Sequence, residues 1–202
     1  MSPRAGIDRT VLLHTAAKLA DCEGLEAVSL ARLAQTLGVK SPSLYNHVHG
    51  LKGLRRALAL HALERMYDAL AQSAVGKAGD DAVIALGKAY VGFVRAHPGQ
   101  YEASLLPPDP DDKELDEAQS RIVELAIRCF QAYRLTPDGL LHAVRGLRSL
   151  CHGFATLEQR GGFGLPLDLN VTLQLLLEAF VSGMRALQNK QREHASNSNP
   201  LV

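Results

Sequence analysis

The sequence predicts an all-α protein with an N-terminal three-helix domain and a larger C-terminal helical domain, about nine helices in all. Apolar residues recur at intervals of three and four through almost the whole chain, as on the buried face of a helix. Capping residues, prolines and glycines interrupt this pattern where helices would begin and end. The chain has 202 residues, 47% of them hydrophobic, which is enough to bury a core.

The first two helices have start and stop signals. Asp8 is a suitable N-cap, and Gly24 stands where a C-terminal glycine would end the first helix. Ser29 can cap a second, shorter helix, which ends at Gly38 because glycine readily adopts a positive φ. In the first helix the residues that recur at helical spacing are Val11, Leu12, Thr15, Ala16, Leu19 and Ala20. The predicted inward residues of the second helix are Leu30, Leu33, Ala34 and Leu37.

A third helix is predicted directly after Gly38. Ser41 supplies a capping side chain, and Pro42 occupies the first helical position, where its missing N–H costs nothing. Leu44 and Val48 continue the helix on its inner side. A two-turn helix, a tight glycine turn and a third helix together make a helix-turn-helix. A longer helix over residues 54–70 then connects this motif to the rest of the chain.

A break in the helical pattern at residues 76–80 marks the predicted domain boundary. The first domain is expected to span residues 1–67 and the second residues 76–188. Five helical segments follow the break: residues 80–97, which Pro98 ends, a short turn around Tyr101, residues 115–133, a helix capped by Thr136, and a last helix from Leu169. Residues 189–202 are polar and are predicted to form a disordered tail.

Composition and charge exclude several classes of protein. No apolar run reaches the roughly 18 residues of a membrane span, and the first nine residues carry charge instead of the apolar core of a signal peptide. A cytoplasmic protein is therefore expected. Cys22, Cys129 and Cys151 lack the short spacing of a zinc site, so neither a metal nor a cofactor is expected. The net charge of +1 hides an excess of about +4 in the first 60 residues, which suits a polyanionic partner at that end.

Hydrogen-bonding side chains gather on the predicted third helix, on the side opposite Leu44 and Val48. Such a surface can meet a DNA groove, with Asn46 on an adenine edge and the helix N-terminus on a phosphate. For a lone short helix a solvated polar face is the better interpretation, but the preceding helix and turn favour DNA binding. The candidate DNA-binding residues are Ser29, Arg32, Lys40, Ser41, Ser43, Tyr45, Asn46, His47 and Lys52.

The run Ser43-Leu44-Tyr45-Asn46-His47-Val48, with Leu33-Ala34 and Gly38-Val39 before it and Leu54 after it, resembles the DNA-binding domain of the tetracycline-repressor (TetR) family. The resemblance covers about residues 7–67. It implies that the third helix enters the major groove, that Tyr45 packs near the DNA backbone, and that a lysine after this helix contacts phosphate. Leu51 holds the usual place of that lysine, with Lys52 beside it.

The second domain resembles a family of regulatory domains named for a tryptophan-histidine-glycine (WHG) motif, through Cys151-His152-Gly153-Phe154, in which cysteine replaces the tryptophan. Aromatic residues in this domain can line a pocket for a small molecule, or they can be ordinary core packing. His152 can donate a hydrogen bond in the same pocket, or it can be a core histidine. The candidate ligand-binding residues are Tyr90, Phe93, Tyr101, Phe130 and His152.

The last two helices each carry two apolar stripes. A helix that is apolar on most of its circumference must bury a second side, and small residues on that side suit contact with a second copy of the chain. The candidate dimer-interface residues are Ala143, Gly146, Leu150, Gly153, Leu157, Leu175, Ala179 and Gly183.

The sequence features bear on three classes of function. A ligand-responsive transcriptional regulator, in particular a repressor that binds a palindromic operator as a homodimer and leaves it when an unidentified small effector binds, fits the features best. A dimeric DNA-binding or adaptor protein without a small-molecule ligand is the alternative. An enzyme is not expected, because the sequence offers no activated nucleophile, no paired carboxylates and no metal cluster as catalytic residues.

Overall fold

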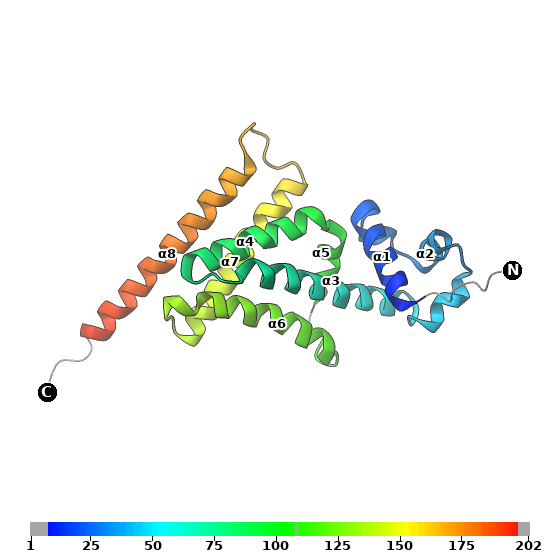
Figure 1. The fold of residues 1–202 in the computed structure, drawn as a ribbon, viewed down its shortest axis with the longest axis horizontal. Coiled ribbons are helices and arrows are strands. Elements are labelled where there is room, and N and C mark those ends of the chain that lie inside the picture. The colour runs from blue at the N-terminus through cyan, green and yellow to red at the C-terminus, as the bar shows by residue number, and fades with distance from the viewer. Residues whose placement is uncertain (1–7, 108, 198–202) are drawn as a thin grey trace. The chain divides into compact units, whose positions relative to one another are not determined.

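The computed structural model describes residues 8–107 and 109–197, and in these ranges it contains helices and no strands (Figure 1). This confirms the all-α prediction, and the six-residue segment η2 together with the eight α-helices gives the expected nine. The elements are α1 (Arg9–Glu23), η1 (Leu25–Ala27), α2 (Leu30–Leu37), η2 (Ser41–Asn46), α3 (Gly50–Ala74), α4 (Gly79–Ala96), α5 (Pro98–Ser104), α6 (Lys113–Phe130), η3 (Gln131–Tyr133), α7 (Pro137–Gln159) and α8 (Leu169–Asn197). The three η segments are 3-10 helices.

Three of the predicted N-caps are confirmed by hydrogen bonds to backbone amides. Asp8 Oδ1 accepts from Thr10 N at 3.4 Å, and Ser29 Oγ accepts from Arg32 N at 3.2 Å. Thr136 caps α7 in the same way. Gly38 ends α2 in the left-handed region, with φ 67°, as the sequence predicted.

The segment predicted as a third α-helix is a 3-10 helix, η2, and its N-cap is Lys40, which makes no side-chain cap. The assignment of Ser41 as a cap is therefore wrong. The backbone hydrogen bonds of η2 join residues three apart, as in the bond that Ser43 N donates to Lys40 O at 2.9 Å. Short helical pieces commonly take this tighter form, and Pro42 removes one amide from the first turn.

Two other boundaries differ from the prediction. Helix α3 begins at Gly50, whose φ of 70° starts the turn, and not near residue 54. Helix α8 continues to Asn197, so the predicted disordered tail is wrong for residues 189–197, and residues 198–202 lie outside the described part. The tail is polar but rich in Gln, Lys, Arg, Glu and Ala, which are good helix formers.

The chain forms two compact units, and neither of them is continuous in sequence. The first contains the chain through Tyr67 together with residues 96–120, whereas the second contains residues 68–95 and the chain from Arg121 onward. The domains expected from sequence were residues 1–67 and 76–188, which places residues 96–120 in the second domain. In the structure the chain returns to the first unit over these residues. We call residues 96–120 the return segment.

The return segment completes the core of the first unit. Leu12, Leu33 and Leu44 are fully buried in one cluster with Ala103 of α5. Helix α5 lies against α1 at Gly99, where a Cβ atom would lie 2.0 Å from the carbonyl oxygen of Ala20. Only glycine permits this approach.

A second contact fixes the start of α6 within the same unit. Arg56 of α3 donates to Asp112 Oδ1 at 2.6 Å and to Glu114 Oε2 at 2.7 Å. Asp112 also accepts from the amide of Leu115 in the first turn of α6. The guanidinium of Arg56 lowers the pKa of the Asp112 carboxyl. The return segment is thus held at both of its ends.

The second unit has its own core between α4, α7, α8 and the end of α6. Phe130 is fully buried and meets Phe180 edge to face, with ring centroids 6.2 Å apart. At Gly87 of α4 a Cβ would lie 2.5 Å from a methyl group of Leu177, and the thiol of Cys151 contacts the Gly87 carbonyl. The absence of a side chain at this glycine lets α4 pack closely on both α7 and α8.

Candidate DNA-binding surface and regulatory unit

The segment η2 presents a polar surface on an apolar anchor. Leu44 is fully buried in the core of the first unit, whereas its neighbour Tyr45 is 56% exposed. Ser43 and Asn46 are exposed on the same short segment. One buried side chain therefore fixes η2 while the residues around it face outward.

The exposed side chains of this surface have no partner within the described residues. This holds for Lys40, Ser43, Tyr45, Asn46 and Lys52, all of which belong to the first unit. A side chain without an internal partner loses no protein hydrogen bond when it binds a base edge or a phosphate. The surface combines two cations with hydroxyl and amide groups, which are the groups that contact DNA phosphates and base edges.

Other predicted DNA-binding residues have structural roles. Ser29 Oγ caps α2, and the Arg32 guanidinium pairs with Glu23 Oε1 at 2.7 Å and donates to Gln35 Oε1 at 3.2 Å. The hydrogen bond to Glu23 raises the pKa of Arg32. Arg32 must therefore leave a solvent-exposed ion pair, which contributes little to stability, before it can contact DNA.

Ser41 and His47 are half-buried at the two ends of η2, and so are less accessible than their neighbours. The sequence reasoning missed His49, which is exposed immediately before α3. The predicted helix began near residue 54, so the prediction did not place His49 and Lys52 on either side of a helix start. The available sequence signal was Gly50 itself, because glycine readily adopts the positive φ of 70° that the structure has there.

The aromatic residues predicted to bind a ligand are buried. In the second unit, Tyr90, Phe93 and Phe130 are 9%, 5% and 0% exposed, and His152 is half-buried. Tyr101 is also buried but belongs to α5 in the first unit. The structure therefore does not gather all five residues in one unit.

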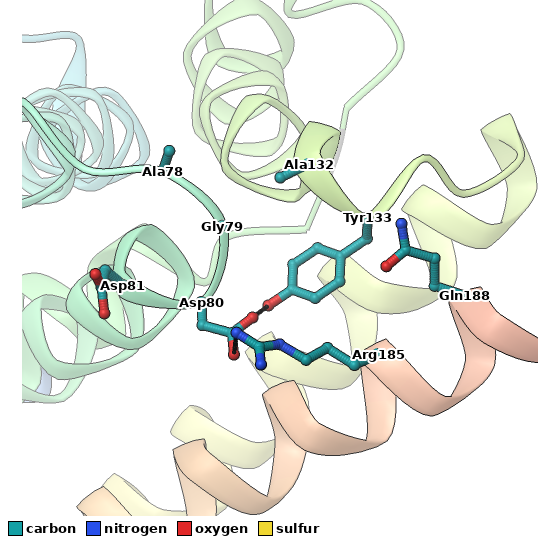
Figure 2. A pocket seen from close by; sticks show the side chains of 8 residues that line it. All are labelled: Ala78, Gly79, Asp80, Asp81, Ala132, Tyr133, Arg185 and Gln188. Atoms are coloured by element: carbon teal, nitrogen blue, oxygen red, sulfur yellow. Dashed lines mark hydrogen bonds and ion pairs between the residues drawn. The ribbon is translucent and has the colours of Figure 1, made fainter.

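A hollow of about 300 Å³ lies in the second unit at the start of α4 (Figure 2). The carboxylate of Asp80 accepts from Tyr133 Oη at 2.5 Å and pairs with Arg185 Nη2 at 2.6 Å. Burial, and then Asp80, raise the pKa of Tyr133. The lining is polar and includes none of the predicted ligand residues; it consists of Ala78, Gly79, Asp80, Asp81, Ala132, Tyr133, Arg185 and Gln188.

Part of the predicted dimer face is exposed. Leu157 of α7 is 51% exposed and Leu175 of α8 is 60% exposed, and Ala179 and Gly183 are exposed on α8. Leu150 and Gly153 are half-buried. Leucines and valine that the prediction did not include extend the exposed apolar surface; they are Leu165, Leu167, Val171 and Leu187.

Two members of the predicted face are misplaced. Ala143 is 4% exposed and belongs to the core. At Gly146 a Cβ would lie 3.2 Å from the ring of Phe180, so this glycine faces α8 of its own chain. Both lie on the inner stripe of α7, and a helix with two apolar stripes gives no sequence signal for which stripe is the inner one.

In the described part of the chain no helix is both long and apolar enough to cross a membrane.

Two family models match the chain in the order of its two predicted domains. Residues 12–47 match the model described as bacterial regulatory proteins, tetR family. Residues 83–180 match the model described as tetracyclin repressor-like, C-terminal domain, which agrees with the WHG resemblance.

Among curated proteins, the chain is 37% identical over 190 residues to an uncharacterised HTH-type transcriptional regulator, YobS, of Bacillus subtilis, covering 91% of this chain and 96% of the relative. Among solved structures, a Rhodococcus protein of unknown function has a TM-score of 0.78 at 23% identity, covering 91% and 98%. A TetR variant from Acinetobacter baumannii in complex with minocycline has a TM-score of 0.67 at 18% identity, covering 90% and 98%. The chain belongs to the TetR family of transcriptional regulators.

Proposed function

We propose that this protein is a ligand-responsive repressor. It binds a palindromic double-stranded operator as a homodimer and leaves the operator when a small apolar or aromatic effector binds its second domain. The observation that carries the proposal is the polar surface of η2, in which Ser43, Tyr45 and Asn46 are exposed and have no partner among the described residues. The proposal places the protein in the cytoplasm with its DNA, and it involves no catalysis.

Each side chain of this surface is assigned a contact by its chemistry. Asn46 reads an adenine through its amide, which can both donate to and accept from that base. Ser43 and His47 contact base edges or phosphates, and Tyr45 packs near the backbone. Lys40 and Lys52 bind phosphates, which adds affinity without adding sequence preference.

The homodimer is supported by the exposed apolar side chains of α7 and α8. Leu157 and Leu175 would each bury more than half of their surface in an interface with a second copy. The exposed positions Ala179 and Gly183 let a partner helix approach closely. Two helices from each protomer form a four-helix interface with twofold symmetry, which matches a palindromic site.

Two observations bear on the proposed effector. The same fold holds minocycline in the Acinetobacter baumannii protein, and the second unit of this chain contains a hollow. The burial of Phe130 against Phe180 and Tyr133 instead favours core packing, and thus the alternative of a dimeric DNA-binding protein without an effector. A thermal-shift screen distinguishes them, because a ligand at 100 times its Kd stabilises the protein by about 2.7 kcal/mol.

Selection of duplexes from a random pool tests operator binding directly. We expect the enriched sequences to contain two inverted half-sites about one helical turn, or a multiple of it, apart. Footprinting and sedimentation of the complex then give the contacts and the number of protomers. A pool without enrichment would refute operator binding, and enriched sites without twofold symmetry would refute the homodimer.

A further inference from the structure

A histidine of the first unit has a buried ring nitrogen without a partner. His61 of α3 is half-buried, and its Nε2 atom is buried and has no hydrogen-bond partner within the described residues. Most buried polar atoms in proteins are paired, so this atom needs an explanation. A neutral histidine ring carries one N–H, whereas a protonated ring carries one on each nitrogen. Protonation therefore makes Nε2 a buried donor without an acceptor, which disfavours the charged ring.

The cation nearest to this ring in sequence is held in place by hydrogen bonds. Arg65 follows His61 by one helical turn and so lies on the same face of α3. Its Nη1 donates to Gln100 Oε1 at 2.6 Å, and its Nη2 lies 3.2 Å from His97 Nε2. His97 in turn lies 3.0 Å from Asp21, measured from Nδ1 to Oδ2. Because Gln100 is 1% exposed, Arg65 loses a buried hydrogen bond if it moves into solvent.

The charged groups that act on His61 come from α1 and α3. His14 of α1 and Arg65 of α3 disfavour a positive charge on the ring, whereas Glu64 of α3 favours it. His14 and Glu64 are exposed, so water weakens the effect of both. Burial first, and then Arg65, lower the pKa of His61 from its ordinary value. The folded first unit therefore keeps His61 neutral at a pH where the same residue in an unfolded chain takes up a proton.

We propose that His61 makes the first unit an acid-sensitive element, which is well ordered while this ring is neutral and loosens when the ring takes up a proton. The buried cluster of the unit joins Leu54 of α3, Leu12 of α1 and Leu44 of η2. A charge on His61 opposes the packing of α3 in this cluster, and a looser cluster no longer fixes η2. Acid then releases the operator through a change within the first unit. This last step rests on the operator binding proposed above, whereas the acid sensitivity of the unit does not.

The direction of the pKa shift defines the pH range of the effect. Because the pKa of His61 is lowered in the folded protein, the folded state binds fewer protons than the unfolded state. The contribution of His61 to the free energy of unfolding is complete above the unfolded value of 6.5 and is lost as the pH falls from there towards the folded pKa. Protonation of histidines on a DNA-facing surface has the opposite effect on operator affinity, because added positive charge strengthens binding to phosphate.

Urea unfolding at about pH 7.5 and about pH 5.5, on either side of the ordinary histidine pKa, measures the acid sensitivity. The midpoint of the unmodified protein should fall in acid, and it should fall less in His61→Gln, whose side chain is neutral at both pH values. His61→Leu is a second neutral variant, which serves if the glutamine variant does not fold. His142→Gln is the matched control, because His142 is exposed on α7 in the second unit. The control should behave as the unmodified protein does.

Two exposed neighbours should change the acid sensitivity in opposite directions. His14→Gln removes a cation and should reduce it, whereas Glu64→Gln removes the acidic neighbour and should increase it. A purely structural role of His61 predicts no such pair of effects. Operator affinity gives a functional measurement. The ratio of Kd in acid to Kd at about pH 7.5 should be at least about fivefold larger for the unmodified protein than for His61→Gln, the lower end of common coupling factors.

Deuterium exchange at the ring carbon between the two nitrogens, followed by mass spectrometry across pH, reports the protonation of each histidine in the unmodified protein. His61 should titrate below about pH 6.5. Titration of His61 at or above this value, or an equal fall of the midpoint in the unmodified protein and its neutral variants, would overturn the proposal. Equal Kd ratios in the unmodified protein and His61→Gln would overturn it as well. Acid sensitivity that depends on His61, without any selected operator, would refute the proposed function and leave the acid-sensitive element intact.

Discussion

Gly99 is the position where one added methyl group should have the largest effect on the fold. The Cβ of an alanine would lie 2.0 Å from the carbonyl oxygen of Ala20, 2.1 Å from its carbonyl carbon and 2.7 Å from the amide nitrogen of Asp21. All three are backbone atoms of α1, so no side-chain rotation can relieve the overlap. Helix α5 has to move away from α1, which also breaks the hydrogen bonds from Gln100 to Asp21.

Overpacking of a core usually costs about 1–3 kcal/mol, and a clash with a backbone places Gly99→Ala at or above the upper end, about 3 kcal/mol. For a chain of this length that corresponds to a fall in Tm of roughly 6–12 °C. Urea unfolding followed by circular dichroism measures the loss as a lower midpoint, and operator affinity should fall in the same variant.

Gly92→Ala is the control. Gly92 lies inside α4, is exposed, and has nothing within 4 Å of an added Cβ. Alanine at this position should raise the free energy of unfolding by about 0.5–1 kcal/mol, because alanine favours the helical conformation more than glycine does. Equal stability of Gly99→Ala and the unmodified protein would refute the close packing of α5 on α1.

Four further outcomes are expected. Asn46→Ala should reduce discrimination at one base position by about 1–3 kcal/mol, measured by competition between operator variants; equal loss on random DNA would contradict base reading. Lys52→Ala should weaken operator and random duplexes alike and flatten the salt dependence by about one phosphate contact, and an unchanged slope would exclude that contact. Leu175→Glu should give monomers in sedimentation that bind half-sites weakly, so a stable dimer would place the interface elsewhere. Burial raises the pKa of Cys151 to about 12, so its thiol stays protonated below that pH; at pH 8 iodoacetamide should modify the exposed Cys22 and spare Cys151, and equal labelling by mass spectrometry would contradict this burial.

Local signals along the chain predicted most of the elements. Asp8, Ser29 and Thr136 each act through a hydrogen bond to a nearby amide, so their role depends on only a few residues. The same rule failed at Ser41, where Lys40 precedes the 3-10 turn and takes the cap position. The choice between an α-helix and a 3-10 helix over six residues depends on packing, here on buried Leu44.

Contacts between distant segments could not be predicted in the same way. Nothing near Gly99 in the sequence indicates that α5 lies against α1, because the partner is almost 80 residues away. The aromatic stripe had two interpretations for the same reason: Phe130 can line a pocket or fill a core, and only its contact with Phe180 on α8 shows that it packs in the core. The exposure of Ser43, Tyr45 and Asn46 could be predicted because their neighbour Leu44 is apolar and marks the buried side of the segment.

The return segment has a consequence for how the protein is made. A ribosome synthesises about 5–20 residues per second, so the roughly 50 residues between Tyr67 and Ser120 take several seconds to emerge after the helix-turn-helix sequence is complete. During that time the surface that Ala103 and Gly99 will cover is open to chaperones and to other nascent chains. For the same reason a fragment that ends at residue 67 lacks part of its own unit and is unsuited to domain exchange. A chimera should resist proteolysis only when residues 96–120 come from the same parent as α1.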